Sequence, residues 1–270
     1  MLFDYTLFCE KITHLKNQIP NALTSLNLVF GCLAIIAALD NRLTDASLFI
    51  GAAAILDFLD GFAARLLHAH SEIGKQLDSL ADVVSFGVAP GMIFYMLEGK
   101  CFAPTGFCIN MYLPFLIPVF SAIRLAKFNI DTRQSDSFIG LPTPANAIFI
   151  ATIPFIILHD TFGISAFFQN QYFLKLFPIL SAYLLVAELP LIALKFKNFS
   201  WSDNKARYLF LALSLISIIA FQYLGIALSI IVYIIVSIIN NLQKIKYEIY
   251  SRNKCDASQS PSRPSRKSSW

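Results

Sequence analysis

The stretch Asp57 to Asp82 reads DFLDGFAARLLHAHSEIGKQLDSLAD and decides the fold class, because it sets four carboxylates in a run apolar enough for a membrane. Asp57 and Asp60 are three residues apart and Asp78 and Asp82 four apart, so on helices each pair projects from one face. A central carboxylate costs a membrane helix about 2.5–3.5 kcal/mol of insertion free energy, so such residues mark functional sites. Carboxylate oxygens suit magnesium, manganese or calcium better than zinc. The stretch therefore predicts a metal site between two membrane helices.

Small residues follow the first acidic pair on the same helix face. Gly61 and Ala64 lie four and seven residues after Asp57, which leaves that face nearly free of side-chain bulk. A ligand can approach the backbone closely there, and phosphate oxygens fit the space beside bound cations. The combination favours a phosphate compound as ligand.

The composition is that of a membrane protein. Of 270 residues, 56% are hydrophobic and 14% charged, and the mean hydropathy is +0.62, more apolar than a soluble core requires. The apolar runs are too many for a signal peptide followed by one domain. The chain has no GxGxxG, no Walker loop and no Ser-His-Asp arrangement, which argues against the enzyme classes built on those motifs.

Hydropathy predicts an all-α, polytopic membrane bundle of about eight helices. Pro20 and an Asn21 cap are expected to open the first. Met1 to Pro20 is either an interfacial segment or a frayed terminus, residues 21–243 form the membrane domain, and residues 244–270 form a basic, disordered tail. The expected spans are Leu23–Leu39, Thr44–Leu67, Ile73–Met96, Tyr112–Lys127, Thr143–Leu158, Tyr172–Leu194, Arg207–Tyr223 and Ile226–Leu242.

Basic residues predict the orientation of these spans. With the amino terminus in the cytoplasm, all Lys and Arg except Arg42, Lys100 and Lys175 fall on the cytoplasmic side. That positive-inside bias places both termini in the cytoplasm. The acidic site then opens to the cytoplasm, where a nucleotide could reach it.

The spacing of the central stretch resembles the signature of the CDP-alcohol phosphatidyltransferase family. The matching pattern is Asp57-x2-Asp60-Gly61-x2-Ala64-Arg65-x8-Gly74-x3-Asp78-x3-Asp82. The resemblance implies a bundle of membrane helices with two divalent ions, Mg²⁺ or Mn²⁺, at its cytoplasmic side. It also implies a homodimer, a bacterial inner-membrane location and no nucleic-acid partner.

Further motifs are similar to the phosphatidylserine synthase branch of that family. They are Pro20-Asn21 with Thr24 to Asn27, Ser85 to Pro90, Arg124 to Asn129 and Gly140 to Pro144. The resemblance implies transfer of a phosphatidyl group from CDP-diacylglycerol to L-serine. Arg124 and Lys127, three apart at a helix end, are candidates for binding the serine carboxylate or are membrane anchors. Asn129 is a further candidate, and Ser85 contacts either substrate or its own helix backbone.

The resemblance also assigns roles within the central stretch. Asp57, Asp60 and Asp78 are expected to bind metal. Asp82 is a further ligand candidate and the expected general base. Gly61 and Ala64 admit the nucleotide beside Asp57 and Asp60, and Arg65 contacts phosphate. Gly74 allows close packing at the cytidine end or simply starts a helix.

Several alternatives remain open on the sequence. The same reaction with glycerol phosphate, inositol phosphate or choline is the nearest one. A cation transporter or a catalytically silent scaffold would also carry intramembrane carboxylates, although neither needs the Gly61-Ala64-Arg65 pattern. Cys101 and Cys108 share a loop and can pair if their compartment is oxidising.

Overall fold

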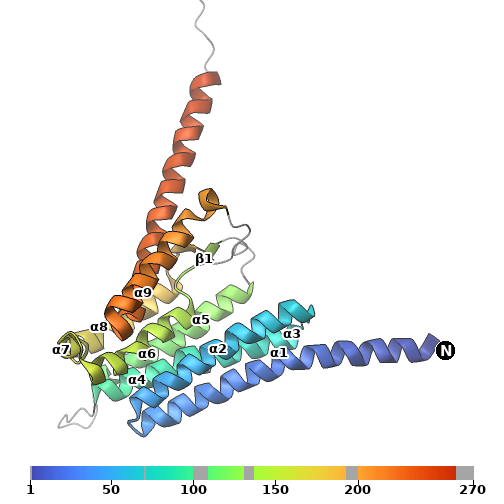
Figure 1. Ribbon diagram of the computed structural model, residues 1–270, viewed down its shortest axis with the longest axis horizontal. Coiled ribbons are helices and arrows are strands. Elements are labelled where there is room, and N and C mark those ends of the chain that lie inside the picture. The colour runs from blue at the N-terminus through green and yellow to red at the C-terminus, as the bar shows by residue number, and fades with distance from the viewer. Residues whose placement is uncertain (1, 70, 100–108, 131–136, 193–199, 260–270) are drawn as a thin grey trace, which may run out of the picture.

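The protein is a bundle of helices with one short two-stranded ribbon (Figure 1). The computed structural model describes residues 2–69, 71–99, 109–130, 137–192 and 200–259. Its elements are α1 (Leu2–Leu39), α2 (Leu43–Leu67), α3 (Glu72–Asp82), the π-helix η1 (Val83–Val88), α4 (Ala89–Glu98), the 3-10 helix η2 (Ile109–Phe115), α5 (Leu116–Ile130), β1 (Ser137–Ile139), α6 (Thr143–His159), α7 (Ser165–Phe168), α8 (Gln171–Val186), β2 (Pro190–Ile192) and α9 (Trp201–Gln259). The predicted polytopic membrane helix bundle is confirmed.

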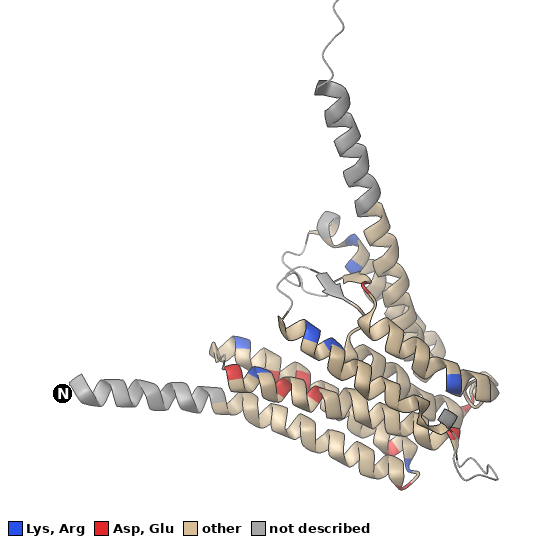
Figure 2. Ribbon diagram, turned by 180° about the vertical axis from the view of Figure 1, so that it is seen from behind, with Lys and Arg blue, Asp and Glu red and all other residues tan. Residues whose placement is uncertain are grey.

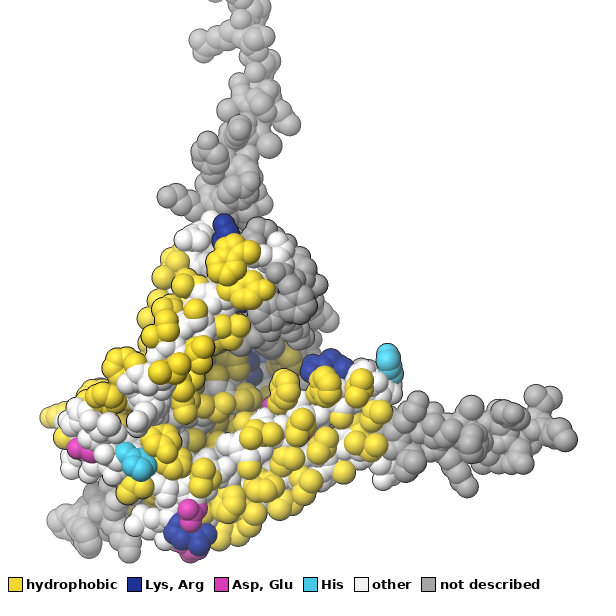
Figure 3. All heavy atoms as spheres, viewed as in Figure 1, with side chains coloured by type: hydrophobic (Ala, Val, Ile, Leu, Met, Phe, Trp, Pro, Cys, Tyr) yellow, Lys and Arg dark blue, Asp and Glu magenta, His cyan; other side chains and the backbone are white. Residues whose placement is uncertain are grey.

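Five helical runs of the described residues are long and apolar enough to cross a membrane: Gln18–Leu39, Leu43–Leu67, Glu72–Glu98, Met111–Ile130 and Asn204–Gln243. The apolar helices α6 and α8 are shorter, with 17 and 16 residues. Large apolar side chains such as Ile55 and Phe58 of α2 are mostly exposed, at 63% and 67%. Figure 3 shows apolar side chains covering the outer faces of the helices, as contact with lipid requires. The count of eight spans stays a prediction.

The long helix α9 contains a reversal at Gln222, whose backbone is not helical (φ 50°, ψ −122°). Residues at similar distances along the chain before and after Gln222 contact each other. The rings of Phe210 and Tyr233 lie 5.5 Å apart, and the hydroxyl of Ser229 donates to the carbonyl of Ser214 at 3.5 Å. Residues before and after Gln222 therefore pack as two antiparallel helices, here called α9a (before Gln222) and α9b (after it).

Small side chains let α1 and α2 approach closely, as is common between membrane helices. Five alanines of these helices are buried: Ala34, Ala37, Ala38, Ala46 and Ala53. Gly31 of α1 lies against Ser85, whose Cα would be only 2.9 Å from a Cβ added at Gly31. The packing holds η1 directly against α1, and η1 follows the acidic part of α3.

The π-helix η1 interrupts the third predicted span. It lies just before Pro90, which occupies the first turn of α4. Because proline lacks an N–H group, it cannot continue an α-helical hydrogen-bond ladder, and a wider turn there accommodates the loss. Single π-helical turns inside α-helices occur frequently at functional sites.

Three predicted boundaries differ from the structure. The helix α1 does not begin at Pro20 but runs through it, and the Thr24 hydroxyl oxygen lies 3.0 Å from the Pro20 carbonyl oxygen. The sixth predicted span ends too late, because α8 stops at Val186 and β2 follows. At the carboxyl end α9 continues to Gln259, since the charged residues after Leu242 are compatible with a helix. Three predictions fall on residues or side chains outside the described part of the protein. They are the lipid-facing side chains of the amino-terminal segment, the pairing of Cys101 with Cys108, and the disorder of residues 260–270.

Candidate active site

A tight turn between α2 and α3 brings the two acidic pairs together. α2 ends with His68 in the left-handed conformation, and the N–H of Ala69 donates to the Ala64 carbonyl at 2.9 Å. Ser71 then caps α3 by accepting from the N–H of Gly74 at 3.0 Å. The two helices run antiparallel from this turn, so residues at similar distances from it face each other.

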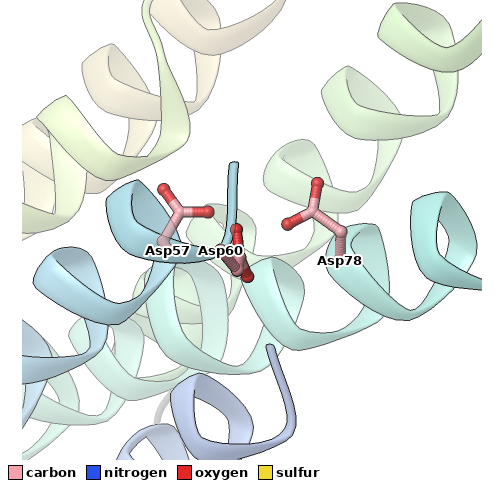
Figure 4. A group of neighbouring side chains, drawn as sticks. All are labelled: Asp57, Asp60 and Asp78. Carbon is pink, nitrogen blue, oxygen red and sulfur yellow. The ribbon is translucent and has the colours of Figure 1, made fainter. Parts of the chain in front are cut away.

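Three carboxylates meet between these helices. Each of Asp57, Asp60 and Asp78 offers a carboxylate oxygen, and these oxygens all lie within 4.8 Å of one another. Figure 4 shows the Asp57 and Asp60 side chains from α2 and the Asp78 side chain from α3 directed toward a shared point. Figure 2 shows that acidic residues are grouped inside an otherwise sparsely charged bundle. This geometry matches the convergence that the sequence spacing predicts.

The three carboxylates fit a divalent cation. No Lys or Arg among the described residues forms an ion pair with Asp57, Asp60 or Asp78. Like charges at such distances repel strongly in a partly buried setting, whereas a bound cation would turn the repulsion into attraction. Carboxylate oxygens are the donors that hard cations such as Mg²⁺ and Mn²⁺ prefer. The cluster can therefore hold a metal.

Two side chains of α1 donate hydrogen bonds to the acidic groups. The Thr24 hydroxyl donates to Asp60 Oδ2 at 2.7 Å, and Asn27 Nδ2 donates to Asp82 Oδ1 at 3.5 Å. Thr24 and Asn27 are three residues apart on α1 and both are buried, so one helix face serves both acidic pairs. Partners of this kind orient metal-binding carboxylates.

Asp82 borders the three clustered carboxylates, with its side chain closest to that of Asp57. It is 7% exposed and interacts electrostatically with all three, most strongly with Asp57, but it does not belong to the group whose oxygens lie within 4.8 Å. Arg124 of α5, also 7% exposed, lies within electrostatic reach of Asp82. The Nε of Arg124 is buried and has no hydrogen-bond partner among the described residues. This leaves a polar group available for a ligand beside Asp82.

A cavity of about 470 Å³ adjoins the cluster between α1, α2 and α3. Five of the six predicted nucleotide-side residues line it, namely Asp60, Gly61, Ala64, Arg65 and Gly74, whereas Asp57 does not. The other lining residues are Pro20, Asn21, Thr24, Ala69, Ser71, Glu72, Lys75 and Asp78. A Cβ at Gly74 would come within 2.8 Å of Asn21 Oδ1 and 2.9 Å of Ser71 Oγ, so a larger residue would require these side chains to shift where α1 and α3 meet. Gly74 therefore starts a helix and also allows close packing.

The four residues predicted to bind serine occupy different environments. Ser85 is fully buried and donates to the Asn27 carbonyl at 3.0 Å, which is neither of the two roles expected for it. Lys127 is exposed. Asn129 Nδ2 donates to Ser79 Oγ at 2.8 Å and so ties α5 to α3. Of the four, Arg124 alone combines burial beside Asp82 with an unpartnered donor.

The structure adds residues that the sequence did not assign to the site. Thr24 and Asn27 were visible only as part of a motif, with no role. Lys75 lines the cavity, and its Nζ donates to the Asn129 carbonyl at 3.1 Å. Tyr233 of α9b lies within electrostatic reach of Arg124. No local spacing links Tyr233 to residues more than a hundred positions earlier, so only the fold could identify it.

Comparison with known proteins assigns the family. The model of the CDP-alcohol phosphatidyltransferase family matches residues 17–194. The chain is 33% identical to the CDP-diacylglycerol–serine O-phosphatidyltransferase of Helicobacter pylori over 237 residues, covering 87% of this chain and 95% of that one. It is 39% identical to the Bacillus subtilis protein of the same name over 140 residues, 52% of this chain and 76% of the relative. An archaetidylserine synthase of Methanothermobacter thermautotrophicus is 36% identical over 138 residues, 50% of this chain and 56% of that one.

The fold and the site thus define an integral membrane protein with an acidic centre beside a polar cavity. The chain belongs to the CDP-alcohol phosphatidyltransferase family and is a transferase. The resemblance inferred from the acidic spacing is confirmed.

Proposed function

We propose that this protein transfers the phosphatidyl group of CDP-diacylglycerol to the hydroxyl of L-serine, forming phosphatidylserine and CMP. The observation that carries the proposal is the position of Arg124, a buried guanidinium with an unpartnered Nε beside Asp82, next to a three-carboxylate cluster. A carboxylate-bearing alcohol needs a cation at this position. The names of the relatives from Helicobacter and Bacillus support the same acceptor.

In the proposed reaction Asp82 accepts the proton of the serine hydroxyl as the oxygen attacks the phosphorus that carries diacylglycerol. A P–O bond to serine forms, the P–O bond to CMP breaks, and CMP leaves with the electron pair. Arg124 would hold the serine carboxylate through a charge-assisted hydrogen bond and so orient the hydroxyl toward Asp82. Asp82 is placed for this role because it is buried, close to Arg124 and outside the three-carboxylate group.

Asp57, Asp60 and Asp78 would hold the divalent ions, which we propose to be two Mg²⁺ or Mn²⁺. When bound, such ions neutralise the pyrophosphate and polarise the attacked phosphorus. Arg65 and Lys75 would contact the phosphates and Gly61 and Ala64 would admit the nucleotide, since all four line the cavity.

We further propose that the cavity opens to the cytoplasm, that the membrane is the bacterial inner membrane and that the protein is a homodimer. The orientation is supported by the Lys and Arg distribution, in which three residues alone would fall on the opposite side. The site would then receive CDP-diacylglycerol from the bilayer and serine from the cytoplasm.

Gly61 gives a test of the nucleotide cavity that separates binding from folding. A Cβ at Gly61 would meet nothing within 4 Å, so Gly61→Ala should fold normally, yet the methyl group would enter the space lined for the ligand. We expect the KM for CDP-diacylglycerol to rise by about tenfold, as overfilling of a packed site costs roughly 1–3 kcal/mol. The matched control is Gly51→Ala in the same helix, where an added Cβ also meets nothing within 4 Å. Gly51 does not line the cavity beside the acidic cluster. Equal KM values for the two variants would place the nucleotide elsewhere.

The function itself is tested by CMP release from purified protein in lipid nanodiscs with CDP-diacylglycerol and Mg²⁺ or Mn²⁺. The acceptors are L-serine, glycerol phosphate, inositol phosphate and choline, each added alone. We expect CMP release with serine at a rate far above the others. Preference for another alcohol would contradict the serine assignment but retain the family reaction, and no CMP release with any alcohol would favour a transporter or scaffold.

A further inference from the structure

Two short strands that are distant in the sequence pair to form a ribbon. Strands β1 and β2 pair antiparallel, with Ser137 opposite Ile192 and Ile139 opposite Pro190. β1 is the next described element after α5, the helix that carries Arg124, and β2 follows α8. A two-stranded ribbon is marginal by itself, so its position depends on what holds it.

Helix α9b binds the ribbon through both backbone polar groups of Ile192, its carbonyl and its N–H. The Tyr233 hydroxyl donates to the Ile192 carbonyl at 3.0 Å, and the Ile192 N–H donates to Ser237 Oγ at 3.2 Å. Tyr233 and Ser237 are four residues apart, so they project from one face of α9b. Both are buried, at 7% and 0% exposure. The free edge of β2 is therefore clamped to α9b.

The other end of the ribbon is fixed as well. The N–H of Gly140 donates to the Leu189 carbonyl and that of Leu141 to the Leu184 carbonyl, each at 2.9 Å. Gly140 has φ +80°, and a Cβ there would come within 2.6 Å of the Leu185 carbonyl oxygen. Leu141, Leu191 and Tyr233 form a separate small apolar cluster. The clamp thus belongs to a hydrogen-bonded unit with its own apolar cluster.

The clamp reaches the proposed acceptor side of the site through Tyr233. Arg124 has two electrostatic partners of note, Asp82 and Tyr233. The same tyrosine therefore donates its hydroxyl to the ribbon and lies within electrostatic reach of Arg124, as Asp82 does. A shift of Tyr233 would displace both the ribbon and the surroundings of Arg124.

Building on the proposed function, we infer that the Tyr233–Ile192–Ser237 clamp makes Tyr233 a positioning residue for the acceptor alcohol. By fixing the ribbon against α9b, the clamp holds Tyr233, which is within electrostatic reach of Arg124, in place and so determines how well the carboxylate of serine is held. The proposed site for CDP-diacylglycerol is the cavity between α1, α2 and α3, which no residue of the clamp lines, so its affinity should not change.

The test compares Tyr233→Phe, which keeps the ring and removes the hydroxyl, with Tyr223→Phe. Tyr223 is a matched control because it also belongs to α9 but stacks on Phe155 and His159 near the reversal. We expect Tyr233→Phe to raise the KM for serine by about tenfold, because a buried carbonyl loses its partner. The KM for CDP-diacylglycerol should change less than twofold, and Tyr223→Phe should change neither.

A second variant keeps the inference testable if Tyr233→Phe is poorly folded. Ser237→Ala removes the other hydrogen bond of the clamp and should also raise the serine KM. The effects of the two substitutions should be less than additive in a double variant, because both side chains bind the backbone of Ile192. Parallel rises in both KM values, or an unchanged serine KM in the folded variants, would overturn the inference. If the wild type uses a different alcohol, the proposed function fails, and the same variants measured with that alcohol decide the clamp separately.

Discussion

Asp82→Asn is expected to lower kcat by about 10²–10⁴-fold while CDP-diacylglycerol still binds, because the amide keeps the size of the side chain but cannot accept the serine proton. Asp82 is the carboxylate best placed for that role, being buried beside Arg124 and outside the three-carboxylate group. The measurement is single-turnover CMP release beside equilibrium binding of CDP-diacylglycerol in the presence of Mg²⁺.

The matched control for this loss is Asp45→Asn. Asp45 pairs with Arg42 at 3.4 Å on an exposed part of α2, so its replacement should leave turnover nearly unchanged. Asp57→Asn should behave differently from Asp82→Asn, weakening metal-dependent binding as well as turnover. Turnover near the wild-type rate in Asp82→Asn would remove Asp82 from the proton transfer.

Arg124→Ala is expected to weaken serine use by about ten- to a hundredfold with little change in CDP-diacylglycerol affinity. A charge-assisted hydrogen bond to a carboxylate contributes about 1.5–3 kcal/mol, and Arg124 has a buried donor available for it. Arg124→Lys should recover only part of the loss, since it keeps the charge without the planar fork. Serine dependence of CMP release gives the values.

Lys127→Ala is the control on the same helix, because Lys127 is exposed at the end of α5. We expect it to change the serine requirement much less than Arg124→Ala does. If Arg124→Ala raised the requirement for both substrates equally, Arg124 would be a structural anchor rather than a carboxylate partner.

The acidic centre was largely predictable because it depends on local spacing. Asp60 precedes the turn after α2 by nearly the same distance at which Asp78 follows it, and Asp57 lies one helical turn before Asp60, so the helix pair brings all three together. The membrane environment follows from the length and apolarity of the runs. These features depend on the spacing of residues and on the cost of burying charge, both of which can be inferred directly from the sequence.

Other features depended on contacts that a sequence does not state. Pro20 reads as a helix start, but α1 continues through it. The apolar residues after Val186 read as more helix, whereas Leu191 lies in a strand that pairs with residues some fifty positions earlier. The sequence predicts that Ser85 contacts either the substrate or its own helix backbone, but the close approach of α1 at Gly31 directs its hydroxyl to the Asn27 carbonyl of α1. Tertiary packing decided each of these cases.

The most direct test of the account is the fate of isotopically labelled serine. Purified wild-type protein in nanodiscs would receive ¹⁵N-serine, CDP-diacylglycerol and Mg²⁺ or Mn²⁺, and the lipids and CMP would be quantified by mass spectrometry. The account predicts ¹⁵N-phosphatidylserine and CMP in equal amounts, with both lost on chelation of the metal and in Asp82→Asn. CMP released without labelled lipid, or labelled lipid formed at the same rate by Asp82→Asn, would contradict it.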